Sequence, residues 1–230
     1  MNPFLRILFR STLFACLVTQ LSTLKAQNQT PPPQPGQTPT PKYTEQQMRE
    51  MVAKLQQRVG KATDQVMGRI KKQEDDLQVR FSYFRKPDRL NPATYSSKED
   101  VAQWQQSLQR LKESADIVEK LYTYADQDLG NALIQQRINQ PVAEQIKNEL
   151  LRSFPWEIIK KKNQLLKEFV AEFGDLLTFY DKNWGSWKTG SSTSAPTFDE
   201  PKLASAYQGL KDKINATGSQ IEDQYKRMTQ

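Results

Sequence analysis

The sequence predicts an all-α fold, an elongated antiparallel helical bundle that resembles a coiled coil, with four long helices and one short helix. Three observations lead to this prediction: apolar residues recur at alternating spacings of three and four, no stretch alternates as a strand does, and prolines separate the stretches. A mean spacing of 3.5 residues keeps such a stripe against a partner helix. The longest unbroken series contains Val101, Trp104, Leu108, Leu111, Ala115, Val118, Tyr122, Ala125, Leu129 and Ala132.

Residues 1–26 have the pattern of a secretory signal peptide. Arg6 and Arg10 precede an apolar run, and cleavage is expected near Ala26. The run is shorter than the roughly 20 apolar residues of a transmembrane helix, so we expect none in the mature chain. The alternative is lipid anchoring at Cys16, but the apolar run continues past this residue and favours a free protein. The sequence therefore predicts a secreted or periplasmic protein.

Cleavage changes the composition. The 230-residue chain carries 33 basic and 26 acidic residues, a net charge of +7. Residues 1–26 hold three basic and no acidic residues, which leaves 30 basic and 26 acidic residues and a net charge of +4. The single cysteine is lost with the signal peptide, so the mature chain has no disulfide and depends on packing for stability.

Residues 27–42 precede the predicted fold. Six prolines lie here among Gln, Thr and Gly, with almost no apolar side chain to bury. This composition favours extended polyproline II, and we expect a disordered tether.

We expect residues 43–230 to form a single domain. The first helix begins at a capping box of Thr44 with Gln47, and the second at a capping box of Ser96 with Glu99. Prolines end or bend the helices that precede them, and Pro201 falls in the first turn of the last helix. The predicted helices are about 44–85, 97–137, 141–153, 155–187 and 200–228.

Residue types exclude most catalytic chemistry. The chain contains no histidine, and the mature chain has no cysteine, so there is no basis for a Ser-His-Asp triad, a thiolate centre or an imidazole metal site. Neighbouring residues splay around a helix, so Glu74–Asp76 and Lys160–Lys162 are expected to be solvated faces, and we find no Glu on an apolar stripe. We predict no catalytic residue, no cofactor and no metal.

One candidate partner surface combines cations with aromatic residues at the end of the first helix. Its candidate residues are Arg80, Arg85, Lys86 and Arg89. Cations here also complement the helix dipole, and the neighbouring phenylalanines fall on the core stripe. An anionic lipid headgroup or a cell-wall polymer suits this segment better than nucleic acid, which a secretory signal disfavours.

A second candidate surface is aromatic. Tyr180, Trp184 and Trp187 lie at the end of the fourth predicted helix, beside a Ser/Thr-rich loop. They predict either an exposed aromatic tip for a partner, because Trp is common at binding hot spots, or a cap over the end of the core.

The sequence predicts a structural or protein-interaction module that is not an enzyme and that binds an unidentified protein partner. Its seams, the apolar stripes along which helices pack, could also be used for self-association. A signal, a tether and basic helical hairpins resemble, in layout alone, periplasmic helical chaperones and helical subunits of secretion machines. The alternatives are therefore a holdase chaperone or a subunit of an envelope assembly machine. A further alternative is electrostatic attachment to an anionic envelope surface.

Overall fold

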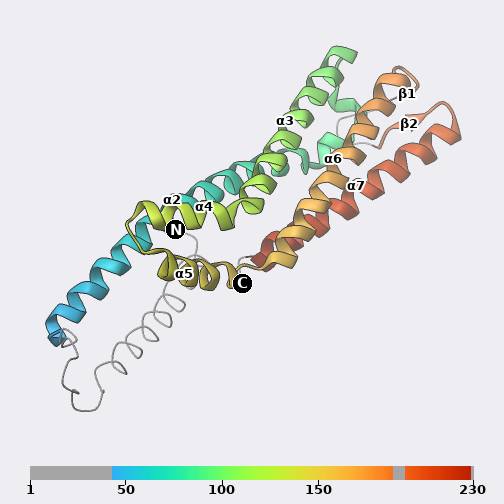
Figure 1. Cartoon of the computed structure of the whole chain (residues 1–230). Helices are drawn as coiled ribbons and strands as arrows, with labels where there is room; N and C mark the ends of the chain where they lie inside the picture. Colours follow the sequence, from blue (N-terminus) through green and yellow to red (C-terminus); the bar gives the residue numbers. More distant parts are fainter. Residues whose placement is uncertain (1–42, 189–194, 229–230) are drawn as a thin grey trace, which may run out of the picture. The chain divides into compact units, whose positions relative to one another are not determined.

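The computed structural model describes residues 43–188 and 195–228. The predicted signal peptide, the tether and Cys16 lie outside these residues. Six α-helices account for most of the described chain (Figure 1). Two short 3-10 helices, η1 (Pro87–Leu90) and η2 (Pro92–Thr94), lie between the first and the second of them. The all-α prediction is confirmed. No helix in the described ranges has the length and apolar character needed to cross a membrane.

Helix α2 (Glu45–Phe84) begins where the capping box predicts. The Thr44 amide donates to Gln47 Oε1 at 2.9 Å, and the Gln47 amide donates to Thr44 Oγ1 at 3.2 Å. Its apolar stripe is buried from Val59 onward, whereas earlier stripe positions are half-buried.

The helix expected over 97–137 is interrupted. It forms α3 (Lys98–Thr123) and α4 (Ala125–Gln135), separated by Tyr124, whose ψ of 4° leaves the helical region. Nine of the ten seam residues are buried, and Trp104 is half-buried. The cap also differs from the prediction: Ser97 Oγ accepts from the Asp100 amide at 3.3 Å, and Asp100 Oδ2 accepts from the Ser96 amide at 2.8 Å.

Helices α5 (Gln140–Arg152) and α7 (Pro201–Met228) have nearly the expected bounds, but α6 (Trp156–Lys182) ends before residue 187. Asn183 caps α6 through amide and side-chain bonds to the Phe179 carbonyl, and Gly185 then turns the chain at a φ of 85°. The short strands β1 (Trp187–Lys188) and β2 (Thr197–Phe198), which the sequence did not indicate, pair in antiparallel register.

The described chain divides into two compact units. One contains the part of α2 up to Arg69 together with Tyr124–Phe154, and the other contains Ile70–Thr123 together with the described residues from Pro155 onward. In the first unit, Lys147 on α5 lies 3.1 Å from an Asp126 carboxylate oxygen on α4, and Arg69 pairs with Asp128.

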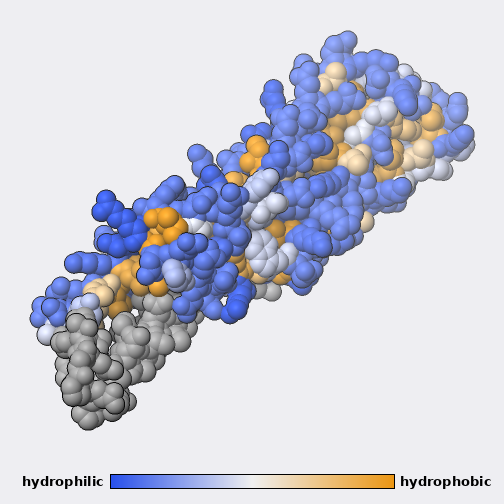
Figure 2. All heavy atoms as spheres, viewed as in Figure 1, coloured by the Kyte–Doolittle hydropathy of each residue, from blue (hydrophilic) through white to orange (hydrophobic). Residues whose placement is uncertain are grey.

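The second unit has an aromatic core to which α2, α3, α6 and α7 contribute. Phe81 meets Phe169 with ring centroids 5.1 Å apart, and Phe84 meets Phe173 at 5.0 Å. Hydrophilic residues cover most of the face in Figure 2, and apolar residues reach this surface only in separate patches. All seven residues of the two predicted partner surfaces belong to this second unit.

Candidate functional site

The segment Arg80–Arg89 spans the end of α2 and η1, and it places its four cations in different surroundings. The Arg80 side chain is 41% exposed, and its Nε lies 2.8 Å from Asp76 Oδ2, one turn earlier. Lys86 is exposed, and its Nζ lies 5.1 Å from the centroid of the Tyr83 ring. These two candidates share one hollow.

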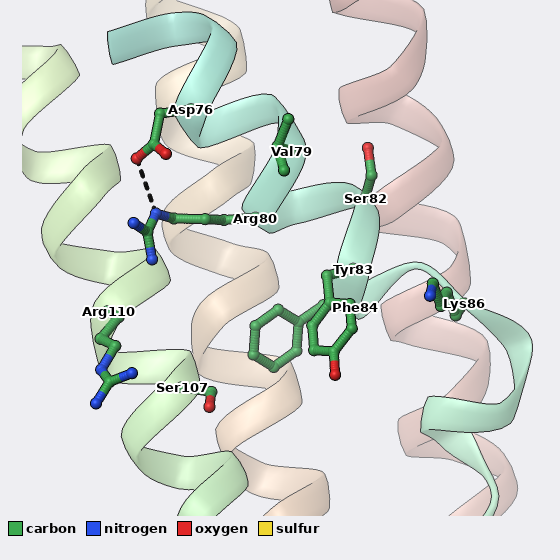
Figure 3. A pocket seen from close by; sticks show the side chains of 9 residues that line it. All are labelled: Asp76, Val79, Arg80, Ser82, Tyr83, Phe84, Lys86, Ser107 and Arg110. Atoms are coloured by element: carbon green, nitrogen blue, oxygen red, sulfur yellow. Dashed lines mark hydrogen bonds and ion pairs between the residues drawn. The ribbon is translucent and has the colours of Figure 1, made fainter.

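That hollow is a groove of about 490 Å³ between α2 and α3, which we call the basic groove (Figure 3). It brings three cations together with exposed apolar side chains, because α3 contributes Arg110 opposite Arg80 and Lys86. Val79 is 70% exposed and Tyr83 is 45% exposed, a high exposure for large apolar side chains. The lining residues are Asp76, Val79, Arg80, Ser82, Tyr83, Phe84, Lys86, Ser107 and Arg110.

A stack of planar groups fixes one wall of the basic groove. The Tyr83 ring is nearly parallel to that of Trp104, at 13° with centroids 5.2 Å apart. The Arg89 guanidinium lies 4.8 Å from the Tyr83 centroid and 4.6 Å from the Trp104 centroid. Arg89 is only 15% exposed, so it supports this wall and is not the free surface cation that the sequence suggested.

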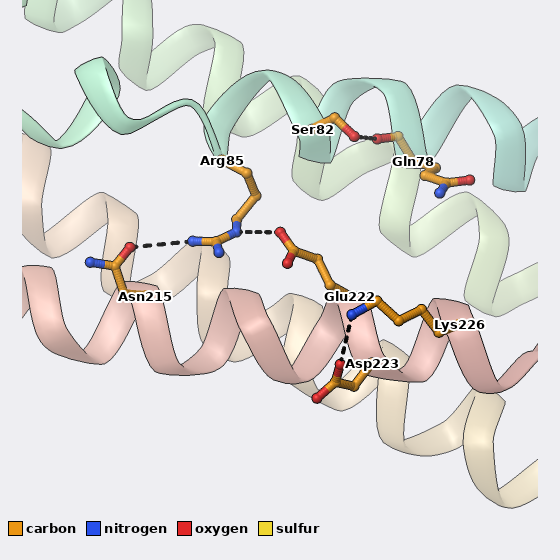
Figure 4. A network of polar contacts seen from close by, with 7 residues as sticks. All are labelled: Gln78, Ser82, Arg85, Asn215, Glu222, Asp223 and Lys226. Carbon is orange, nitrogen blue, oxygen red and sulfur yellow. Dashed lines mark hydrogen bonds and ion pairs between the residues drawn. The ribbon is translucent and has the colours of Figure 1, made fainter.

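Arg85 is also held inside the fold. Its Nε donates to Glu222 Oε1 at 2.8 Å, and its NH1 group donates to Asn215 Oδ1 at 3.3 Å, both on α7 (Figure 4). Gly218 lets the side chain pass, since a Cβ there would lie 2.7 Å from the guanidinium carbon. Arg85 therefore links α7 to the end of α2, and its side chain is only 18% exposed.

The aromatic candidates behave as a cap more than as an exposed tip. Tyr180 is fully buried, which fits the cap and not the exposed tip. Trp184 and Trp187 are half-buried, and their rings meet edge to face at 5.4 Å. Trp187 also packs at 5.7 Å on Tyr180 and at 6.4 Å on Phe198, so these rings cover the core where α6 ends.

Two tyrosines converge on one backbone oxygen beneath this cap. The Tyr180 hydroxyl donates to the Leu90 carbonyl at 2.8 Å, and the Tyr207 hydroxyl donates to the same oxygen at 2.7 Å. Burial raises the pKa of Tyr180 well above its ordinary value and raises the pKa of Tyr207 to about 12. The neutral phenols thus tie α6 and α7 to η1.

A buried ion pair joins two segments that were expected to be solvated. Lys162 on α6 is fully buried and pairs with Glu74 on α2, which is 8% exposed. The Lys162 Nζ lies 5.7 Å from the Tyr122 centroid and 5.3 Å from the Tyr225 centroid, and the Tyr225 hydroxyl donates to Glu74 Oε2 at 3.5 Å. Glu74 is therefore a carboxylate on the apolar stripe, contrary to expectation.

Burial controls the electrostatics of this pair. Desolvation lowers the pKa of Lys162, and the Glu74 carboxylate opposes this by favouring the ammonium. The pKa values of Tyr122 and Tyr225 are raised, first by burial and then by the Glu74 charge. The arrangement is a closed structural ion pair, because the lysine has no contact with solvent from which a substrate could enter.

Within the described ranges, no group of three or more acidic residues is placed to hold a metal ion. In the basic groove, exposed charge and exposed apolar surface meet. Comparison with protein-family models, with curated proteins and with solved structures gave no match.

Proposed function

We propose that this protein is a non-enzymatic interaction module that acts in a secreted or periplasmic setting and binds a protein partner through the basic groove. The lack of histidine along the chain and the predicted loss of its one cysteine support a role in binding. The closed Lys162–Glu74 pair fits a structural role, whereas the cations of the basic groove are exposed.

One observation carries this proposal. Val79 and Tyr83 are both exposed apolar side chains, at 70% and 45%, and both line the same hollow. Exposed apolar surface rimmed by polar groups is typical of binding sites, and Tyr and Arg are enriched at the contacts that dominate protein interfaces.

The proposed architecture is an antiparallel bundle with coiled-coil-like seams, in which α2 and α3 carry most of the groove lining. The packing of α3 and α7 against α6 supports it, as does the burial of the seam residues on α3. Sites built on helices hold their geometry better than sites on loops, so this scaffold suits a preformed binding surface.

Photo-crosslinking in the native cell envelope tests the proposed function. A benzoylphenylalanine placed at Val79 in the full chain is expected to give a discrete protein adduct on irradiation. The adduct is expected to disappear in a Lys86→Glu/Arg110→Glu variant. It is expected to persist in a Lys72→Glu/Lys120→Glu variant, which changes the charge equally at exposed positions outside the groove.

Two results would overturn the proposal. One is the absence of any protein adduct from position 79 in a variant that is folded by circular dichroism. The other is an adduct that both charge variants weaken equally, since this result would show attraction by net charge alone. Salt-sensitive binding to anionic vesicles without a protein adduct would instead support attachment to an envelope surface.

A further inference from the structure

The apolar floor of the basic groove limits what can occupy it. Val79 and Tyr83 lie one helical turn apart on α2, and the buried Phe84 ring closes the base between them and α3 (Figure 3). The volume of about 490 Å³ lies within the range of sites that bury compact ligands. Such a hollow accepts a few side chains, one of them apolar, and does not accept a whole helix.

This floor is already ordered before an occupant arrives. Phe84 meets the Trp104 ring edge to face at 5.4 Å and the Phe173 ring at 5.0 Å. Tyr83 is held by its stack on Trp104 and by Arg89. Since these rings lose little freedom on binding, a small contact area can still give specific affinity.

The rim carries an excess of positive charge. Arg80, Lys86 and Arg110 contribute three cations and Asp76 one carboxylate, which leaves a local charge of +2. Asp76 is engaged by Arg80 at 2.8 Å. Lys86 and Arg110 are both exposed, and among the described residues no carboxylate forms an ion pair with either, so these two cations are available to an anionic occupant.

From this arrangement we infer that the basic groove binds an acidic segment of a partner protein, in which one aromatic or aliphatic side chain is flanked by carboxylates. The apolar side chain packs on Val79, Tyr83 and Phe84, and the carboxylates pair with Lys86 and Arg110. This inference rests on the proposed function, and it adds the chemistry of the partner.

The geometry favours such a segment over a membrane surface. The groove is concave between two helices, so a flat layer of headgroups would meet its rim but not Phe84. The Asp76 carboxylate on the same rim repels a dense anionic layer, whereas a segment can place its charges away from Asp76.

A peptide titration tests the inference on the full mature chain. The probe is a fluorescently labelled peptide of the sequence Asp-Glu-Phe-Glu-Asp, and binding is followed by anisotropy. Replacing its Phe by Ser, or its acids by the corresponding amides, is expected to weaken binding by about tenfold or more, the equivalent of about 1.4 kcal/mol for each lost contact. The Lys86→Glu/Arg110→Glu chain is expected to lose binding, and the Lys72→Glu/Lys120→Glu chain to retain it.

Each outcome has a distinct meaning. If the peptide with Ser in place of Phe bound as tightly as the original peptide, binding would depend on unspecific charge attraction alone. This result would overturn the inference. Equal binding to phosphatidylglycerol vesicles through the same two cations would assign the groove to a lipid surface and overturn it as well. A failed titration together with a protein adduct from position 79 would overturn the acidic segment while the proposed function stands.

Discussion

Replacing Lys162 or Glu74 alone is expected to destabilise the fold strongly, whereas replacing both is expected to be tolerated. The three variants are Lys162→Met, Glu74→Gln and the double variant. Met and Gln keep nearly the volume of the native side chains, and Gln retains an acceptor for the Tyr225 hydroxyl, which lies 3.5 Å from Glu74. The variants therefore isolate the effect of the two charges.

The expected magnitude follows from burial. Lys162 is fully buried and the Glu74 side chain is only 10% exposed, so each single variant leaves an uncompensated charge in the core. Breaking a buried pair from one side costs about 3–5 kcal/mol, whereas replacing both partners by neutral residues of similar size is often neutral or stabilising. The double variant should thus lie within about 1–2 kcal/mol of the native chain.

Urea unfolding followed by circular dichroism measures these differences. Lys161→Met is the matched control, because Lys161 is exposed beside the buried lysine and should change the free energy of unfolding by less than about 0.5 kcal/mol. In Glu74→Gln, Lys162 loses the carboxylate that supports its charge. Stability of this variant should rise with pH in the alkaline range below about 10, since the unfolded chain there still binds a proton that the folded core disfavours. Losses below about 1 kcal/mol in both single variants, adding up in the double variant, would refute the buried pair.

Three further predictions concern local structure. Gly209→Ala should raise the free energy of unfolding by about 0.5–1 kcal/mol, because nothing lies near the added Cβ. Gly218→Ala should give no such gain, because its Cβ would displace the Arg85 side chain. Equal gains for both variants in urea unfolding would contradict this prediction. Thr44→Ala should lower the helical stability of α2 by about 0.5–2 kcal/mol, visible as faster amide exchange in its first turn, and unchanged exchange would rule out the cap. The free energy of unfolding should fall as pH rises above 10, because tyrosines ionise in the unfolded chain while burial holds the pKa of Tyr207 at about 12 in the folded chain. Tyrosinate absorbance that develops fully before the chain unfolds would disprove this prediction.

The helical fold could be predicted from the sequence because its signals are local and repeated. Spacings of three and four select the buried face of α3, and the Thr44–Gln47 capping box fixes the start of α2. The break at Tyr124 carries no Pro or Gly. The seam continues across it without a change of spacing, so periodicity alone could not separate α3 from α4.

The buried ion pair had a sequence signal that was missed. Glu74 lies four residues after Ile70 and three before Leu77, so it occupies a position of the apolar stripe. Lys162 lies three residues after Ile159 and four before Leu166 in the same way. A negative charge on one apolar stripe and a positive charge on another indicate a buried ion pair. The acidic and basic runs that contain these two residues indicate only solvated faces.

The candidate site was predicted only in part. Arg80 and Lys86 line the basic groove, but nothing near them in the sequence indicates that Arg110 faces them from α3. Arg85 stands in the same run of cations as Lys86. Its side chain nevertheless packs against Gly218 on α7 and hydrogen-bonds to Glu222. The exposure of Arg85 depends on contacts with a helix more than a hundred residues away in the sequence. The neighbouring residues in the sequence do not indicate such contacts.

The most direct test of the basic groove as the partner site uses three of the four tryptophans of the chain as reporters. Trp104 stacks on Tyr83 behind the groove, whereas Trp184 and Trp187 lie together at the end of α6. In a titration with the acidic peptide, the indole N–H resonance of Trp104 should shift while those of Trp184 and Trp187 stay in place. Shifts confined to Trp184 and Trp187 would place the partner at the aromatic cap and contradict the account.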